Sequence, residues 1–193
     1  MYRGGGTTIL NIFTQNDTST KDDGTVNRLI ETCSQSKESL STLYCMFKKS
    51  VFAVAFSITS DYHLSEDCVA ETFIRLTQVR NFNPTKGDGR GFIHKVARNV
   101  ALEMRRSHCK DIDNVYISNY GESDCTIERS IFLNELLTNL NDKQRQIVVM
   151  RCCSELSFKE IAKIMKCPES TVKSRYKKAI SILQEKAGAD SEK

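Results

Sequence analysis

The chain has 193 residues, a formal net charge of +4 and eight cysteines. This length suits one medium or two small domains, each with its own hydrophobic core. No apolar run approaches the roughly eighteen residues that a membrane span requires, and the N-terminus lacks the layout of a signal peptide. We therefore expect a cytoplasmic protein with no membrane insertion.

Residue usage predicts an all-α protein without catalytic chemistry. The chain has two prolines and no tryptophan, and its apolar residues recur at helical spacing without strand-like alternation. The eight cysteines show no paired C-x-x-C spacing, so we expect thiols rather than disulfides or a zinc site. The three histidines are scattered and are interpreted as surface residues. No phosphate-binding loop or Ser-His-Asp order occurs, so we predict neither an enzyme nor a cofactor.

Residues 1–36 are polar and include three consecutive glycines at positions 4–6. We predict a disordered N-terminal extension here. Residues 26–30 are compatible with the start of a helix, so the extension need not be featureless throughout.

Residues 37–110 are predicted to form a first helical domain. Apolar residues from Leu40 to Ile58 step by three and four, which predicts one long helix that ends near Ser60. A second helix is expected to begin with Ser65 as its cap. The loop "NFNPTKGDGRG" follows, because proline and glycine interrupt helices. A third, strongly basic helix is predicted from Phe92 onward.

The charge distribution indicates two basic domains joined by an acidic segment. Residues 40–110 and residues 131–187 each hold eleven Lys and Arg against six Asp and Glu. Residues 111–130 hold five acidic residues against one arginine, and we predict a flexible linker there. Two basic domains on a tether favour two contacts with one long polyanion.

Residues 131–187 are predicted to form a second domain of four helices, followed by a frayed tail over 188–193. Asn141 with Gln144, and Ser157 with Glu160, have capping-box spacing. The stretch "SFKEIAKIMKCPESTVKSRYKKAISIL" then contains two short amphipathic helices with Pro168 at the joint. This pattern is typical of a helix-turn-helix, whose second helix enters a DNA major groove. An ordinary helical hairpin with a solvated basic face is the alternative.

Taken together, the two blocks resemble bacterial RNA polymerase sigma factors of the extracytoplasmic-function group (group IV, sigma-70 type). The stretches "SEDCVAETFIRL", "NFNPTKG" and "GFIHKVARNVALEMRR" are similar to region 2 of that family. The stretch that begins "LNDKQRQIVVMRCC" and runs through the helix-turn-helix is similar to region 4. The resemblance implies a sigma factor that binds core polymerase and directs promoter-specific initiation.

In this family, region 2 binds the beta-prime clamp and opens the minus-10 element, while region 4 binds the minus-35 element and the beta flap. The resemblance places core-polymerase contact at Asp67 and Glu71. It also implies an anti-sigma factor as a partner. The residues implied in minus-10 binding are Lys95, Arg98, Asn99, Arg105 and Arg106, and those implied in minus-35 binding are Thr171, Lys173, Ser174, Lys177 and Lys178.

Three positions depart from the family pattern: Ala70 replaces a usual glutamine, Gly89 a usual phenylalanine, and Phe92 a usual tryptophan. Two other functions stay open at this point. One is a stand-alone helix-turn-helix regulator that acts without core polymerase. The other is a thiol or metal sensor built on His108, Cys109 and the pair Cys152 and Cys153.

Overall fold

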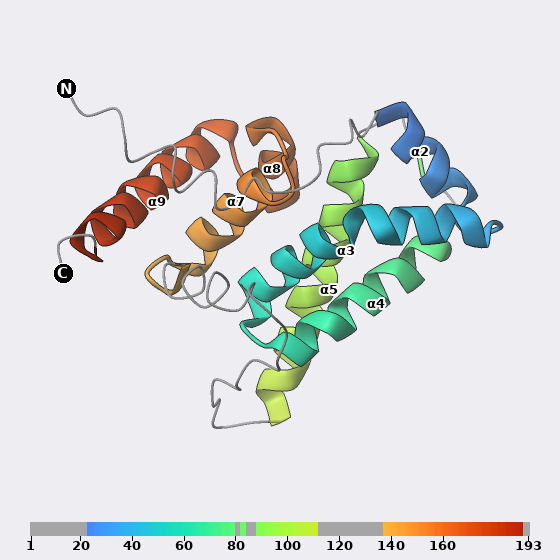
Figure 1. The fold of residues 1–193 in the computed structure, drawn as a ribbon, viewed down its shortest axis with the longest axis horizontal. Coiled ribbons are helices and arrows are strands. Elements are labelled where there is room, and N and C mark those ends of the chain that lie inside the picture. Colours follow the sequence, from blue (N-terminus) through green and yellow to red (C-terminus); the bar gives the residue numbers. More distant parts are fainter. Residues whose placement is uncertain (1–22, 80–81, 84–87, 112–136, 191–193) are drawn as a thin grey trace. The chain divides into compact units, whose positions relative to one another are not determined.

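The protein is described by a computed structural model over residues 23–79, 82–83, 88–111 and 137–190. In these ranges every regular element is a helix (Figure 1), so the predicted all-α fold class is confirmed. The chain divides into two compact units, one over Thr18–Ser118 and one that contains Asn119–Lys193. Residues 1–22 of the predicted extension, residues 191–193 of the predicted tail and most of the predicted linker lie outside the described residues. Residues 188–190, predicted as part of the frayed tail, belong to the last helix instead.

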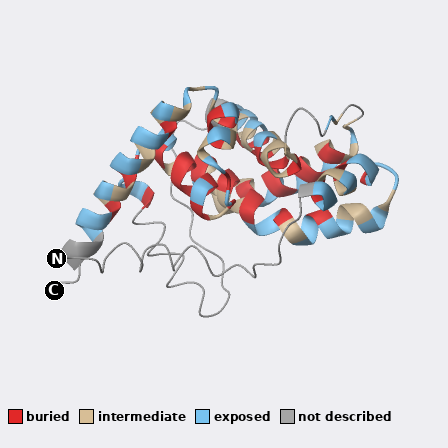
Figure 2. Cartoon of the chain, turned by 90° about the horizontal axis from the view of Figure 1, so that it is seen from above, coloured by how far each residue is buried: buried red, intermediate tan, exposed pale blue. Residues whose placement is uncertain are grey.

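The first unit contains four helices, α2 (Asp23–Thr32), α3 (Lys37–Thr59), α4 (Tyr62–Thr77) and α5 (Gly89–Asp111). Helix α3 begins after Ser36, whose hydroxyl accepts a hydrogen bond from the Ser39 amide at 3.2 Å. It ends at Ser60, as predicted, where the backbone turns left-handed with φ 55°. Inward-facing apolar side chains of all four helices form one core, coloured red in Figure 2: Val26, Ile30, Leu43, Phe47, Val51, Val69, Phe73, Leu76, Ile93 and Ala97.

Helix α2 differs from the disordered extension that we predicted for residues 1–36. Val26 and Ile30 are 0% and 2% exposed, and α2 packs against both α3 and α5. The Asn27 side-chain oxygen accepts a hydrogen bond at 2.8 Å from the backbone N–H of Gly89, the first residue of α5. The contacts that stabilise α2 therefore come both from the next helix and from residues about 60 positions further along the chain, and the polar neighbours of α2 concealed them.

Helix α4 begins earlier than predicted, because Asp61 rather than Ser65 is its cap. The Asp61 carboxylate accepts a hydrogen bond from the Leu64 amide at 2.7 Å. Ser65 is fully buried inside the helix, and its hydroxyl donates to the Asp61 carbonyl. A serine in the first turn can satisfy its hydroxyl in this way, so its presence alone did not mark the helix start.

The second unit contains α7 (Asp142–Cys152), α8 (Phe158–Met165) and α9 (Glu169–Asp190). Both predicted capping boxes are confirmed, at Asn141 with Gln144 and at Ser157 with Glu160. The first helix predicted for this domain lies mostly outside the described residues. The unit's core is formed by buried apolar residues of all three helices and the segment between α7 and α8: Ile147, Val148, Met150, Leu156, Ile161, Val172, Ala179 and Leu183.

None of the described helices combines the length and the apolar character that crossing a bilayer would require.

Candidate functional site

The joint between α8 and α9 has the geometry of a helix-turn-helix. Helix α8 ends at Lys166, which adopts a left-handed conformation with φ 52°. The Cys167 amide donates back to the Ala162 carbonyl at 3.1 Å, which closes the end of α8. Pro168 precedes α9, and its carbonyl accepts hydrogen bonds from the amides of the first turn of α9. This sharp turn separates α8 from α9, as the sequence predicted. Helix α8 is short as expected, whereas α9 spans 22 residues and is longer than predicted.

An aromatic contact braces α9 against the helices that precede it. The rings of Phe158 in α8 and Tyr176 in α9 meet edge to face with centroids 5.3 Å apart. The Arg151 guanidinium lies over the Phe158 ring at 5.1 Å and donates to the Leu156 carbonyl at 3.0 Å. The Tyr176 hydroxyl lies 3.9 Å from the Cys152 sulfur, and burial raises the pKa of Tyr176 to about 12. These contacts join α7, α8 and α9, so the orientation of α9 is set by side chains from both neighbours.

The five residues that the resemblance assigns to the minus-35 element all lie in the first three turns of α9. Four of them are exposed, and Thr171 is half-buried. Lys173 is engaged within the helix, because its ammonium lies 2.7 Å from the Glu169 carboxylate. The Ser174 hydroxyl donates to the Thr171 carbonyl at 3.1 Å. The structure thus brings the set together and adds Glu169, an acidic neighbour that the motif did not single out.

Helix α5 carries the residues assigned to the minus-10 element, and the structure divides them. Lys95, Asn99 and Arg106 are exposed, and Arg98 is half-buried. At about 100° of rotation per residue, these four positions lie on one face of α5. Arg105 differs, because its guanidinium donates to the Ile58 carbonyl at the end of α3 at 3.0 Å. Arg105 thus supports the fold of the first unit, which the sequence pattern did not indicate.

The two residues assigned to core-polymerase contact lie one turn apart on α4. Asp67 is exposed, whereas Glu71 is half-buried and forms an ion pair with Arg75 at 2.7 Å. Arg75 also pairs with Glu103 of α5 at 2.7 Å. Hydrogen bonds to both carboxylates raise the pKa of Arg75. Glu71 is therefore part of an ion-pair network that links α4 to α5. Of the two predicted residues, Asp67 is the one whose carboxylate is exposed.

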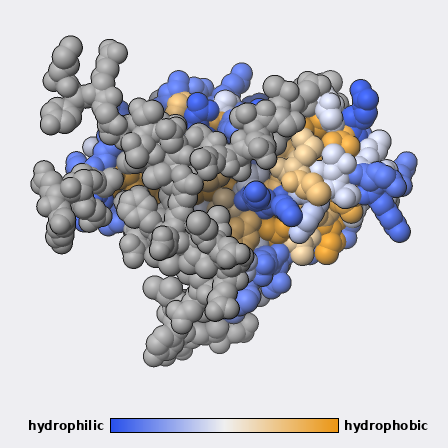
Figure 3. Space-filling view, viewed as in Figure 1, coloured by the Kyte–Doolittle hydropathy of each residue, from blue (hydrophilic) through white to orange (hydrophobic). Residues whose placement is uncertain are grey.

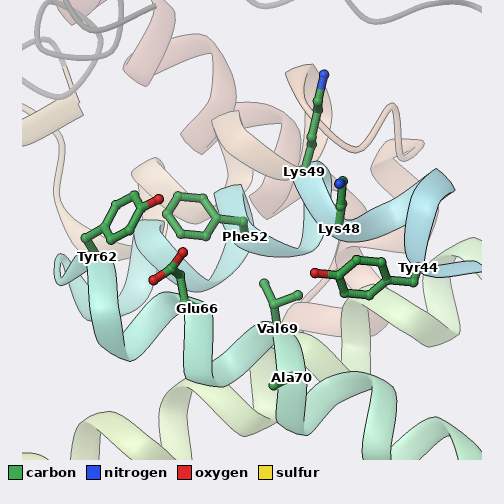
Figure 4. A pocket seen from close by; sticks show the side chains of 8 residues that line it. All are labelled: Tyr44, Lys48, Lys49, Phe52, Tyr62, Glu66, Val69 and Ala70. Carbon is green, nitrogen blue, oxygen red and sulfur yellow. The ribbon is translucent and has the colours of Figure 1, made fainter. Parts of the chain in front are cut away.

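A surface pocket between α3 and α4 was missed at the sequence level. It has a volume of about 370 Å³. Tyr44 falls within the apolar pattern predicted from Leu40 to Ile58, yet 42% of its surface is exposed and it forms one wall of the pocket. Periodicity could not reveal this, because a residue at the edge of a stripe can face either way. Figure 4 shows the eight lining side chains, which are Tyr44, Lys48, Lys49, Phe52, Tyr62, Glu66, Val69 and Ala70.

His94 is a second departure, because it is fully buried rather than at the surface. Its Nδ1 lies 2.8 Å from the Arg90 carbonyl, and its Nε2 lies 3.1 Å from the Ser50 hydroxyl. Since a carbonyl only accepts, Nδ1 carries a proton in this arrangement. The ring also meets Phe47 edge to face at 5.9 Å. His94 thus connects α5 to α3 inside the core.

The described cysteines argue against a thiol or metal sensor. Burial raises the pKa of Cys153 to about 12, and it also raises the pKa of Cys152. A thiol that stays protonated is a poor nucleophile and a poor metal ligand. Within the part of the chain that the structure describes, no three His, Cys, Asp or Glu side chains are placed to hold a metal ion. The Cys109 side chain lies outside the described residues.

Comparison with known proteins agrees with both units. The family model for sigma-70 region 2 matches residues 43–110, and the model for sigma-70, region 4 matches residues 133–183. The chain is 28% identical over 140 residues to the ECF RNA polymerase sigma factor SigM of Bacillus subtilis (strain 168), with 68% of this chain and 85% of the relative covered. It is 22% identical over 157 residues to SigW of the same strain, with 72% and 83% covered.

Two solved structures share the fold. CnrH in complex with the cytosolic domain of CnrY gives a TM-score of 0.67 at 16% identity, with 86% of this chain and 99% of that one covered. The sigma factor RpoE in complex with the anti-sigma factor NepR from Bartonella quintana gives 0.61 at 24% identity, with 78% and 96% covered.

A region 2 bundle followed by a region 4 helix-turn-helix defines an RNA polymerase sigma factor of the sigma-70 type. The chain belongs to the extracytoplasmic-function group of this family. It acts with core RNA polymerase and promoter DNA to direct promoter-specific transcription initiation, and a stand-alone regulator is not favoured.

Proposed function

We propose that the two units divide promoter recognition and core binding between named surfaces. In this proposal α9 contacts the minus-35 element, α5 contacts and opens the minus-10 element, and α4 contacts the beta-prime clamp. The proposed domain bounds are 37–110 and 131–187, with α2 added to the first domain because its apolar side chains are buried there. The chain itself catalyses nothing and acts in the cytoplasm.

The minus-35 assignment rests on two features of α9 taken together. One face of the helix is exposed and basic, and the opposite face is buried against the rest of the unit. Lys177 and Lys178 are exposed, while Val172 and Ala179 are fully buried. Lysines can neutralise phosphates, and short hydroxyl side chains near a helix N-terminus suit phosphate or close base contacts. Region 4 is also proposed to sit on the beta flap, as in the family.

The minus-10 assignment is supported by the exposed face of α5. The Asn99 amide can both donate and accept, which suits recognition of a base edge. Lys95 and Arg106 lie beside it and can neutralise phosphates of the separated strands. Taking bases of the opened strand out of the stack costs free energy. In this proposal, contacts of α4 with core polymerase and of α9 with duplex DNA offset that cost.

An anti-sigma factor is a further proposed partner. Two solved relatives with the same fold are in complexes with proteins, and one of those proteins is an anti-sigma factor. The kind of anti-sigma factor is not part of the proposal.

The first experiment mixes purified protein with bacterial core polymerase and asks whether the two co-elute and direct discrete transcripts from a genomic library. Transcripts that require both components would support the proposal and give the promoters through their start sites. Tight, specific DNA binding without affinity for core would contradict it.

A second experiment tests the division between surfaces. Lys173→Ala and Lys178→Ala should each reduce promoter-specific transcription and leave core binding unchanged, because both side chains lie on α9. Asp67→Ala should weaken core binding and leave promoter contact by assembled holoenzyme largely intact. If all three variants behaved alike, the assignment of separate surfaces would be wrong.

A further inference from the structure

The pocket between α3 and α4 has an apolar interior that faces outward. Phe52, Val69 and Ala70 line it, and the Tyr44 ring closes one side. Tyr44 packs edge to face on Phe73 of α4 at 5.1 Å, so its ring is held in place while much of it remains exposed. In the space-filling view, apolar surface gathers over α3 and α4 among hydrophilic side chains (Figure 3). An open, preformed apolar pocket of this size is suited to one large side chain of a partner.

The rim of the pocket favours a partner with a carboxylate next to that side chain. Lys48 and Lys49 are both exposed, and neither forms an ion pair with a carboxylate among the described residues. The Lys48 ammonium lies 5.5 Å from the centre of the Tyr44 ring, which keeps it at the pocket mouth. Across the pocket, Glu66 lies 3.9 Å from Nδ1 of His63, and its negative charge raises the pKa of Tyr62. The rim therefore carries two ammonium groups, Lys48 and Lys49, against the single carboxylate of Glu66, and its net charge is positive.

Ala70 keeps the pocket open and connects it to the proposed core contact. Members of this family usually carry a glutamine at this position, and the longer side chain would extend over the pocket. Ala70 follows Asp67 by three residues, so both lie on the outward side of α4 and are neighbours there. Exposed Ile74, one turn further, continues the same face. A partner that contacts Asp67 thus also meets Ala70 and the pocket mouth.

We propose that the pocket takes a large apolar or aromatic side chain of core RNA polymerase, with a neighbouring carboxylate of the polymerase paired to Lys48 and Lys49. Ala70 determines this contact by leaving the pocket unfilled. The inference rests on the proposed core contact of α4 and specifies its chemistry. The alternative explanation is that alanine at this position merely loses a contact that glutamine makes.

The two explanations of Ala70 predict opposite changes in the affinity for core polymerase when the residue is replaced by glutamine. Ala70→Gln should weaken binding to core at least tenfold if the pocket is occupied, because the new side chain competes with the polymerase side chain for the same space. It should strengthen binding if the missing amide is what matters. Ala70→Ser is the matched control, since serine is small, leaves the pocket open and should bind core within about twofold of the original chain.

The charge part of the proposal has its own variant. Lys48→Ala with Lys49→Ala should weaken core binding several-fold and flatten its dependence on salt, because two screened ion pairs are removed. Lys37→Ala is the control, because Lys37 is an exposed lysine at the other end of α3 and does not line the pocket. Binding is measured by competition with a fluorescently labelled full-length chain for purified core polymerase, and helical content is checked by circular dichroism.

The outcomes separate this inference from the proposed function. If Asp67→Ala weakens core binding but Ala70→Gln binds as well as or better than the original chain, α4 contacts core and the pocket proposal is wrong. If neither change has an effect, the assignment of α4 to core is wrong, and the pocket proposal is overturned with it. Weakening by Ala70→Gln and by the double lysine variant, with both controls unchanged, supports the pocket contact.

Discussion

Replacing Gly89 with alanine should destabilise the first unit, because α2 leaves no room for a side chain there. An added Cβ would lie 2.7 Å from the Asn27 side-chain oxygen, 2.8 Å from Ile30 Cδ1 and 3.0 Å from Val26 Cγ1. Val26 and Ile30 are buried, so their methyl groups cannot move out into water. Overpacking of this kind costs about 1–3 kcal/mol. The better helix propensity of alanine offsets at most about 1 kcal/mol of this.

The Asn27 hydrogen bond gives a second estimate for the same joint. Asn27→Ala removes the acceptor that satisfies the Gly89 N–H at the start of α5. The loss of a side-chain cap costs about 0.5–2 kcal/mol. The double variant should cost less than the sum of the two single changes, because Asn27→Ala also removes one of the atoms that the new Cβ would meet.

Hydrogen exchange on the full-length chain measures this directly. Amides of α2 and of the first turns of α5 should exchange faster in both variants, while those of α7 to α9 serve as an internal reference. Arg28→Ala is the control, because Arg28 is the exposed neighbour of Asn27 on α2 and its loss should change stability by less than about 0.5 kcal/mol. Unchanged exchange in α2 of the Gly89→Ala protein would refute the packing described for this helix.

Three further predictions concern single contacts. Glu169→Gln should release Lys173 from its ion pair and raise the affinity of the protein for promoter and non-promoter DNA by about twofold. Filter-binding or anisotropy titrations should also show a steeper salt dependence. A loss of affinity for promoter DNA alone would instead mean that Glu169 contacts a base. Arg105→Ala should lower the free energy of unfolding by about 1–2 kcal/mol, since it removes a charged donor from the Ile58 carbonyl. A normal thermal unfolding profile together with a defect in minus-10 recognition would contradict this structural role of Arg105. At pH 8 iodoacetamide should label the exposed thiol of Cys45 far faster than that of Cys153. The pKa of Cys153, about 12, leaves roughly one molecule in ten thousand with a thiolate there. Equal labelling rates by mass spectrometry would show that Cys153 is not buried as the structure describes.

The second unit could be predicted from sequence because its signals are local. Each capping box is encoded within four residues, at Asn141 to Gln144 and at Ser157 to Glu160, and the structure forms both. The turn at Pro168 is equally local. Such features depend little on the rest of the chain, so reading neighbouring residues was sufficient.

The first unit was harder to predict because its decisive contacts join distant residues. Helix α2 is short and polar in composition, and part of its burial comes from contacts with Gly89 of α5. The roles of His94 and Arg105 likewise depend on Ser50 and on the Ile58 carbonyl, 44 and 47 residues away. Composition and periodicity show which residue types are present, but they do not show which residues contact each other in the fold. The hydrogen bond from Arg105 to the Ile58 carbonyl was missed for this reason.

The joint between Asn27 and Gly89 also affects the order in which the protein matures during synthesis. The two residues are 62 positions apart, so α2 leaves the ribosome well before α5, whereas α3, on which it also packs, follows it directly. At the usual translation rates of about 5–20 residues per second, this delay is about 3 to 12 s. During that time the part of the apolar side of α2 that packs on α5 is not yet covered. Completion of α5 ends that exposure, so the core of the first unit is complete only when its last helix has been made.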